Sequence, residues 1–386
     1  MNKLPNGWEE KRLDDLFKEF TEKNHADKNI LASTQDRGVI PSDLLDRHII
    51  RKKESLSNYK LVKKGCFVIS LRSFQGGFEY SNYEGIISPA YTILEPKMKL
   101  VDDFYKYYFK SYYFINKSLP KYAEGIRDGK QIKYKACKEI LVPYPPLDEQ
   151  KRIASALSKI DAYLENTIKL IEEKERFKRG IAKKLLTCKE GENIPEARFK
   201  GFEDEWETIM LGDILSYEQP KDYIVKSEEY NNKYKYPVLT AGKTFILGYT
   251  NEEFGIYNKL PVIIFDDFTT DAQYVDFPFK VKSSAIKILK SKYYNTKLIY
   301  ELIKNIKFNA RTHKRYYISE YQYLKIKIPK SIKEQEKIGG YLSLLDAEID
   351  NLKKQKKLIK EIKRGAMQKL LSGEVRLSKN AFNENI

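Results

Sequence analysis

The string FDDFTTDAQYVDF in the second half of the chain concentrates acidic residues that could support catalysis. Asp266 and Asp267, followed by Asp271, could hold Mg²⁺ for phosphodiester hydrolysis, and Lys280 or Lys282 stands close by in the sequence. The other interpretation is a turn between two strands, where Asp and Thr are expected because their side chains hydrogen-bond to the backbone.

The first half of the chain argues against a nuclease. After its own VISL string it has Arg72 and Ser73 but no acidic pair, so a catalytic centre would exist in one half only. A metal-dependent DNA nuclease using Asp266 and Asp267 therefore stays as an alternative, and the turn is favoured.

Other strings that suggest catalysis are incomplete. TAGKT (240–244) is similar to a nucleotide-binding loop, but Pro237 occupies the position where that motif requires its first Gly. YPPL (144–147) lacks both the polar and the aromatic residue of an adenine-methylase motif, and the three histidines are too scattered for a metal site or a general base. We expect no catalytic residue, no metal and no cofactor in this chain.

The net charge points to a polyanionic partner. The 386 residues include 71 Lys and Arg against 54 Asp and Glu, a balance of +17. Nucleic acid is the first candidate and an acidic membrane surface the second, while a generally lysine-rich proteome would also produce such a balance. The charge is spread over both halves instead of forming one membrane-binding cluster, which favours a duplex followed along its length.

The apolar pattern and the cysteines predict a cytoplasmic location. No stretch approaches the roughly 18 consecutive apolar residues that span a bilayer, and the N-terminus has no apolar run typical of a secretory signal. Cys66, Cys137 and Cys188 are odd in number and far apart, which is typical of a protein in a reducing compartment.

An internal repeat decides the domain organisation. Residues 334–372 align without a gap on residues 149–187, and 15 of the 39 positions are identical, too many for chance. A weaker repeat precedes each copy, where WEEKRLDDLF (8–17) matches WETIMLGDIL (206–215). The chain is therefore two copies of one unit, each a Trp-led variable segment followed by a long helical segment.

The repeated segments are predicted to be helices. Ile153, Leu157, Ile160 and Leu164 step by three or four residues in the first copy, and the second copy has the same period with no proline. Such a helix spans about 60 Å at 1.5 Å per residue, more than one small domain buries. We expect the two helices to pack on each other as an antiparallel coiled coil; the alternative is two amphipathic helices, each lying on its own domain.

The variable segments are predicted to be mixed α/β domains. Strings such as GCFVISL (65–71), SPAYTIL (88–94), LPVIIF (260–265) and SAIKILK (284–290) are typical of strands, and residues 102–119 and 295–306 are typical of helices. The expected fold is α+β and pseudo-two-fold symmetric. Its predicted parts are a first domain (1–147), a first helix (148–187), a linker (188–202), a second domain (203–330), a second helix (331–375) and a flexible tail (376–386).

These features together resemble the specificity (S) subunit of type I restriction-modification systems over nearly the whole chain. The most specific parts are the paired EQ-x-x-I-x-x-x-L-S-x-x-D-A helix starts, the paired KRG-x-x-x-x-LL helix ends and the W-E-x-x-x-L-x-D entries. The strings PYPPLDEQ and IPKSIKEQ before the helices also fit.

The resemblance implies a non-catalytic, DNA-binding subunit with two target-recognition domains, each reading one half of a split sequence in double-stranded DNA. The two helices would set the gap and dock two methyltransferase (modification) subunits. Those partners would hold S-adenosylmethionine, and restriction subunits, where present, would use ATP and Mg²⁺. A DNA-bound coiled-coil scaffold is the remaining alternative, although it would not need two large, divergent, basic domains.

Residue types then suggest which loops read DNA, because Arg and Lys suit guanine, Asn and Gln suit adenine, and small hydroxyls fit the groove. In the first domain the candidates lie after VISL and in GIRDGKQIKYK: Arg72, Ser73, Phe74, Gln75, Arg127, Lys130, Gln131 and Lys133, with Gly76 and Gly77 allowing close approach. In the second domain they are Lys243, Thr269, Thr270, Gln273, Arg311, Thr312, His313, Lys314 and Arg315.

Candidate partner-binding residues come from the repeat. Lys178 and Arg179 recur at equivalent positions as Lys363 and Arg364. Equivalent surfaces on two halves would present equivalent docking sites to two copies of one partner, whereas ordinary solvated helix faces are the alternative.

Overall fold

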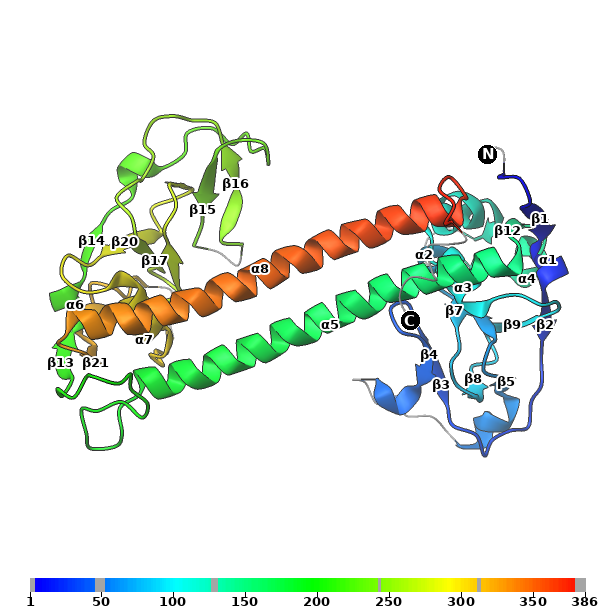
Figure 1. Ribbon diagram of the computed structural model, residues 1–386, viewed down its shortest axis with the longest axis horizontal. Helices are drawn as coiled ribbons and strands as arrows, with labels where there is room; N and C mark the ends of the chain where they lie inside the picture. The colour runs from blue at the N-terminus through cyan, green and yellow to red at the C-terminus, as the bar shows by residue number, and fades with distance from the viewer. Residues whose placement is uncertain (1–3, 46–52, 126–130, 242–243, 311–313, 379–386) are drawn as a thin grey trace. The chain divides into compact units, whose positions relative to one another are not determined.

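A computed structural model describes residues 4–45, 53–125, 131–241, 244–310 and 314–378 (Figure 1). The chain divides into two compact units, of which unit 1 comprises residues 1–168 with 355–386 and unit 2 comprises residues 169–354. Two 40-residue helices, α5 (Leu147–Leu186) and α8 (Ile332–Leu371), each contribute one half to each unit.

Unit 1 is built on a four-stranded antiparallel sheet. Its order is β2 (Phe17–Phe20), β9 (Thr92–Pro96), β6 (Phe67–Ile69), β7 (Glu79–Tyr80). Four two-stranded ladders accompany it: β1 (Glu9–Arg12) with β12 (Leu141–Tyr144), β3 (Leu31–Thr34) with β4 (Gly38–Pro41), β5 (Lys60–Val62) with β8 (Gly85–Ile87), and β10 (Ala123–Glu124) with β11 (Gln131–Ile132). The short helices are α1 (Leu13–Leu16), α2 (Ser73–Gly76), α3 (Asp102–Tyr108) and α4 (Tyr134–Cys137).

Unit 2 repeats the order of the four-stranded sheet with different residues. Its four-stranded antiparallel sheet has the order β14 (Ser216–Glu218), β20 (Ile286–Lys290), β17 (Val262–Asp266), β18 (Ala272–Val275). The other elements are β13 (Glu207–Met210) with β21 (Lys325–Ile328), a sheet of β16 (Ile246–Thr250), β15 (Tyr236–Leu239) and β19 (Lys280–Val281), and helices α6 (Leu211–Ile214) and α7 (Thr296–Lys304). The four strings predicted to be strands are confirmed as β6, β9, β17 and β20.

Each unit buries the start of one long helix and the end of the other. In unit 1, Ile153 and Leu157 of α5 lie in the same apolar core as Leu370 and Leu371 of α8. In unit 2, Ile338 and Leu342 of α8 share a core with the equivalent leucine pair of α5, 185–186. The predicted apolar seam therefore packs into the domain cores at both ends of each helix, because a residue every three or four positions faces one side.

Ion pairs join the helix halves within each unit. In unit 1 the Nζ atom of Lys363 lies 2.5 Å from a carboxylate oxygen of Asp161. In unit 2 the equivalent lysine, Lys178, lies 2.5 Å from the equivalent aspartate, Asp346. Each repeat thus supplies the lysine of the ion pair in one unit and the aspartate in the other. In both units the paired halves of α5 and α8 run in opposite directions.

The segment predicted to be a linker and the first residues of the predicted tail each bind the start of a long helix. Arg198 donates two hydrogen bonds to the carboxylate of Glu334, at 2.7 and 2.8 Å. Arg376 donates two to the carboxylate of Glu149, at 2.8 and 2.5 Å. Both glutamates are buried at the start of a long helix and need a cationic partner, which an E-x-R string supplies at 196–198 and again at 374–376.

The pKa of Glu149 reflects this contact. Burial is the largest single influence and raises the pKa of this carboxyl, but the contacts with Arg376, Trp8 and Arg152 together outweigh burial and bring that pKa below its ordinary value. A lowered folded-state pKa means that the contact stabilises the protein above the pKa of the unfolded chain, about 4.3, and that this stability is lost as the pH falls.

We expect Arg376→Ala to lower the free energy of unfolding of unit 1 by about 1–2 kcal/mol, because it removes two charge-assisted hydrogen bonds and leaves Glu149 buried without them. Urea unfolding at pH 7 measures the loss. The difference from the wild type should shrink as the pH approaches 4. Arg176→Ala, which removes an exposed guanidinium from α5, serves as the control and should change little. Equal effects of the two variants would contradict this account.

Candidate nucleic-acid interface

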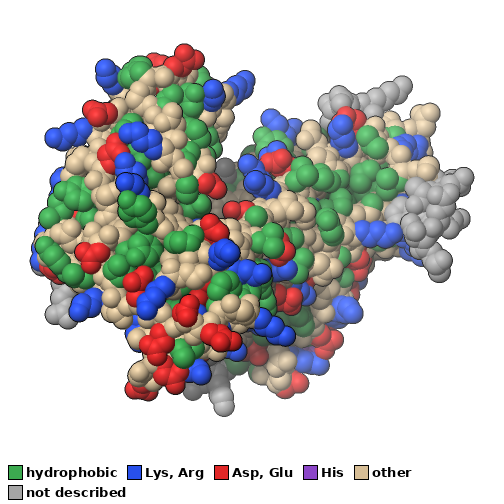
Figure 2. Space-filling model, turned by 60° about the vertical axis from the view of Figure 1, so that its left-hand side comes forward, with side chains coloured by type: hydrophobic (Ala, Val, Ile, Leu, Met, Phe, Trp, Pro, Cys, Tyr) green, Lys and Arg blue, Asp and Glu red, His purple; other side chains and the backbone are tan. Residues whose placement is uncertain are grey.

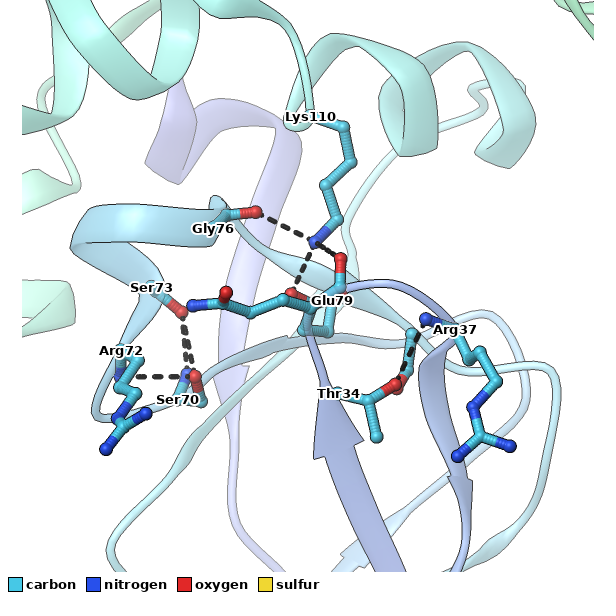
Figure 3. A network of polar contacts seen from close by, with 10 residues as sticks. Thr34, Arg37, Ser70, Arg72, Ser73, Gly76, Glu79 and Lys110 are labelled. Carbon is cyan, nitrogen blue, oxygen red and sulfur yellow. Dashed lines mark hydrogen bonds and ion pairs between the residues drawn. The ribbon is translucent and has the colours of Figure 1, made fainter. Parts of the chain in front are cut away.

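In unit 1 the loop after β6 folds into the single turn of α2 (Figure 3). The backbone N–H of Ser70 donates to the Ser73 hydroxyl at 2.8 Å, and the N–H of Gly77 donates to the Ser73 carbonyl at 2.8 Å. Gly77 has a φ of +75°, and an added Cβ there would lie 1.9 Å from the carbonyl oxygen of Phe109. The turn therefore requires glycine at this position.

The α2 turn exposes some of the predicted DNA-reading residues and buries another. Arg72 and Gln75 are exposed, and Leu71 beside them is 50% exposed. Ser73 is buried, and its hydroxyl is used by the Ser70 backbone, so its side chain has a structural role instead of the predicted one. Phe74 packs partly against the apolar core and anchors the turn.

Two further segments of unit 1 lie against α2. The strand β11, which begins at the predicted residue Gln131, lies beside α2. The Nζ atom of Lys110 donates to the carbonyl of Gly76 at 2.8 Å and forms an ion pair with Glu79. Burial is the main cause that raises the pKa of Glu79, and the contact with Lys110 acts in the opposite direction. Sequence reasoning missed Lys110, since nothing in its local string FKS marks a lysine that joins distant turns.

The remaining candidates of the first domain differ in status. Lys133 is exposed and pairs with Glu124 at 3.0 Å, so part of its charge is neutralised within the ladder of β10 and β11. Arg127 and Lys130 lie outside the described residues.

In unit 2 the acidic string after β17 is a structural turn. The Asp266 carboxylate accepts hydrogen bonds from the backbone N–H groups of Phe268 (2.8 Å) and Thr269 (3.3 Å). Asp267 is buried, accepts from the N–H of Tyr317 at 2.8 Å and lies 3.5 Å from Lys287 Nζ. Among the described residues, no group of three or more His, Cys, Asp and Glu side chains could hold a metal ion. The nuclease alternative therefore finds no support.

Asp267 brings two of the predicted clusters of unit 2 together. Its bond to Tyr317 holds the segment around 314–317 against the turn, where the Arg315 guanidinium lies 5.9 Å from the centre of the Phe268 ring. Thr269 is exposed at the tip of this turn, and Thr270 is half-buried with a φ of +63°. The described parts of the two predicted clusters, the turn at 268–270 and the segment 314–317, thus lie next to each other.

The other candidates of the second domain lie at exposed positions or outside the described residues. Gln273 is exposed on β18, and Lys314 is exposed but pairs with Glu320. Lys243, Arg311, Thr312 and His313 lie outside the described residues.

The repeat-equivalent lysines on the helices are not free docking groups. Lys178 is buried between Glu301 (3.1 Å) and Asp346 (2.5 Å), so its assignment to partner binding was wrong. Lys363 is partly exposed but pairs with Asp161. Arg179 and Arg364, the neighbouring candidates, are both exposed.

A groove of about 1140 Å³ lies beside α2 in unit 1. Its lining includes Gln75, the exposed rings of Tyr112 and Tyr113, and the exposed Arg364 of α8. More widely, Figure 2 shows Lys and Arg side chains distributed over the visible face and interspersed with Asp and Glu, instead of gathered in one patch. No helix in the described part of the chain is long and apolar enough to cross a lipid bilayer.

The family model for the type I restriction modification DNA specificity domain matches this chain twice, over residues 5–173 and 203–363. The chain belongs to this family. The two matches start near Trp8 and Trp206 and each extends into one of the long helices, as the internal repeat does. The protein is a specificity subunit of a type I restriction-modification system and recognises DNA sequence.

Individual relatives agree with this assignment. The MjaVIII specificity subunit of Methanocaldococcus jannaschii is 25% identical over 98% of this chain and 96% of its own length. The EcoR124I/EcoR124II specificity subunit of Escherichia coli is 51% identical over 141 residues, a match that spans 35% of this chain and 34% of that relative. The crystal structure of the S subunit from M. genitalium has the same fold, with a TM-score of 0.64 over 96% of this chain and 97% of its own, at 20% identity.

We expect Asp267→Ala in this specificity subunit to lower the free energy of unfolding of unit 2 by about 2–3 kcal/mol, because Lys287 loses its buried counter-charge and the Tyr317 N–H loses its acceptor. The segment carrying Arg315 should also detach from the turn. Thermal unfolding and limited proteolysis measure the two effects. Asp271→Ala, at an exposed position of the same turn, is the control. An Asp267→Ala variant as stable as the wild type would contradict the structural role.

Proposed function

We propose that this specificity subunit reads a bipartite target in double-stranded DNA, each variable domain reading one half. The main support is that both units have the same order of strands in the four-stranded sheet, whereas the equivalent turns expose different residues. The β6–β7 connection exposes Arg72 and Gln75, whereas the β17–β18 connection exposes Thr269 beside Arg315. One scaffold with two sets of hydrogen-bonding groups suits two different half-sites.

In this proposal, affinity for DNA and selection of the base sequence come from different groups. A net charge of +17 attracts the phosphate backbone whatever the base sequence, and salt weakens that attraction. Arg72 and Arg315 suit the O6 and N7 atoms of guanine, and Gln75 suits the N6 and N7 atoms of adenine. Each of these side chains stands on a turn fixed by buried polar contacts, so its position is set before DNA arrives.

We infer that α5 and α8 pair along their length as an antiparallel coiled coil with pseudo-two-fold symmetry, and that this pair sets the gap between half-sites. The support is the exchange of roles between Lys178–Asp346 in unit 2 and Lys363–Asp161 in unit 1. Lys174–Glu348 (2.7 Å) and Lys353–Glu175 (2.8 Å) add further ion pairs within unit 2.

We propose that two methyltransferase subunits dock on repeat-equivalent surfaces, and that restriction subunits join where the system has them. The exposed side chains at equivalent positions are Arg179 and Arg364. In this account S-adenosylmethionine, ATP and Mg²⁺ are held by the partner subunits. The specificity subunit itself carries out no catalytic step, and its own contribution is to place the partners on a chosen sequence.

The doubly charge-reversed variant Arg179→Glu with Arg364→Glu is expected to reduce co-purification of the methyltransferase subunit about tenfold or more, because like charges then meet at both docking surfaces. Its unfolding temperature should stay close to that of the wild type, since both positions are exposed. The matched control is Lys135→Glu with Lys292→Glu, which reverses one exposed charge in each unit at positions outside the long helices. Undiminished co-purification of the Arg179/Arg364 variant would rule out this docking surface.

Mapping of methylated bases across a genome tests the proposed function. Cells that co-express this chain with its methyltransferase subunit should gain methylation at a single split motif with two defined parts and a constant gap. A continuous motif, or no new methylation despite a purified complex, would contradict the proposal.

A further inference from the structure

We propose that the β3–β4 turn, residues 35–37, is a second specificity-determining element of unit 1, and that Lys110 is the positioning residue that joins it to the α2 turn. The inference rests on the proposed function, because it identifies further residues that read the same half-site. None of the residues 35–37 stands out in the sequence, where TQDRG has the composition of an ordinary polar turn.

Lys110 holds the backbones of both turns with one ammonium group (Figure 3). Its Nζ atom donates to the carbonyl of Gln35 at 3.1 Å and to the carbonyl of Gly76 at 2.8 Å. The third partner is Glu79, whose side chain is 2% exposed. An ammonium has three N–H donors, so these three acceptors saturate it and fix the two turns relative to each other.

Close packing confirms that the two turns form one surface. A Cβ added at Gly76 would lie 2.8 Å from the Cγ atom of Gln35, so the Gln35 side chain passes directly over the α2 turn. On the other side of the β3–β4 turn, Gly38 has a φ of +74°, and a Cβ there would lie 2.7 Å from the carbonyl oxygen of Tyr80. The β3–β4 turn is thus seated against both α2 and the end of β7.

The side chains of the β3–β4 turn offer the chemistry that reads bases. Gln35, Asp36 and Arg37 are all exposed. Within the described part of the chain, the Arg37 guanidinium donates one hydrogen bond, to the carbonyl of Leu44 at 3.3 Å, and a guanidinium has five N–H donors. Figure 3 shows Arg37 and Arg72 on the two turns with both guanidinium groups directed away from Lys110.

Asp36 favours base reading over simple phosphate contact. An exposed carboxylate in the middle of the turn repels the DNA backbone, which makes the turn a poor clamp for phosphates. The same carboxylate accepts a hydrogen bond from the N4 amino group of cytosine, and Gln35 and Arg37 beside it suit adenine and guanine.

The topology of unit 2 gives independent support. The strands β3 and β4 stand in the chain between the first sheet strand β2 and the central strand β6. In unit 2, β15 and β16 stand between β14 and β17 in the same way. In both units, therefore, a pair of antiparallel strands precedes this strand of the sheet, and in unit 1 the connection of that pair is the turn at residues 35–37.

The test uses Gln35→Ala and Arg37→Ala in the full chain, co-expressed with its methyltransferase subunit, with methylated motifs mapped across the genome. Each variant is expected to lose discrimination about tenfold at one or two positions of one half of the motif, with the other half unchanged. The control is Arg12→Ala, which removes an exposed guanidinium already paired with Asp14 at 3.0 Å, and it should leave the motif intact.

Two results would overturn the inference. Methylation that weakens equally at all sites with an unchanged motif would show a phosphate contact, and an unchanged motif at full strength would show no contact. Either result leaves the split motif of the wild type in place, so the proposed function would stand. Absence of a split motif in the wild type would instead defeat the proposed function.

Lys110→Met tests the positioning role separately. Lys110→Met should lower base discrimination at the same positions of the motif as Gln35→Ala and Arg37→Ala. Lys110→Arg should restore that discrimination in part. The control is Ile153→Val, a core change in the same unit on the long helix α5, which should lower the unfolding temperature and keep the motif. A Lys110→Met protein that keeps the wild-type motif would exclude the positioning role.

Discussion

The architecture depends on one reciprocal contact, in which the lysine near the end of each repeat binds the aspartate near the start of the other. Asp161 pairs with Lys363 in unit 1, and Asp346 pairs with Lys178 in unit 2. A partly buried ion pair adds little net stability, but in unit 2 any other pairing of the helices would leave the buried Lys178 without a counter-charge, which costs far more. The contact therefore selects which helix halves pair and in which direction. Each unit is consequently assembled from segments of both repeats, and neither variable domain has a complete core without the end of the other repeat's helix.

A similar division holds within each recognition surface, where buried polar groups fix the backbone and exposed groups are left for DNA. In unit 1 the Glu79–Lys110 pair anchors the turns that expose Arg72 and Gln75. In unit 2, Asp267 accepts from the Tyr317 backbone and anchors the segment that exposes Arg315. Exposed residues on an anchored turn can change without loss of the fold. This explains how two domains of one sheet topology come to share so little sequence.

Sequence alone predicted the features that depend on local periodicity and failed where long-range contacts decide. The two helices, the strands β6, β9, β17 and β20, and the repeat that relates the two halves all follow from apolar spacing and direct comparison. Strand order could not be predicted, because it is set by pairings between distant segments. The assignment of Lys178 to partner binding was wrong for a related reason. The repeat shows that Lys178 is equivalent to Lys363, and that Asp161 is equivalent to Asp346. It does not show that each lysine binds the aspartate of the other copy. The linker was taken for a simple connection because its polar composition gives no sign that Arg198 binds the buried Glu334.

Exchange of one variable domain is the sharpest test of whether the two domains read DNA independently. Residues 1–147 are replaced by the corresponding segment of another specificity subunit, and methylated bases are mapped in cells that also express the methyltransferase subunit. We predict that one half of the split motif changes while the other half and the gap stay the same. A change in both halves, or a motif that the exchange leaves untouched, would contradict it.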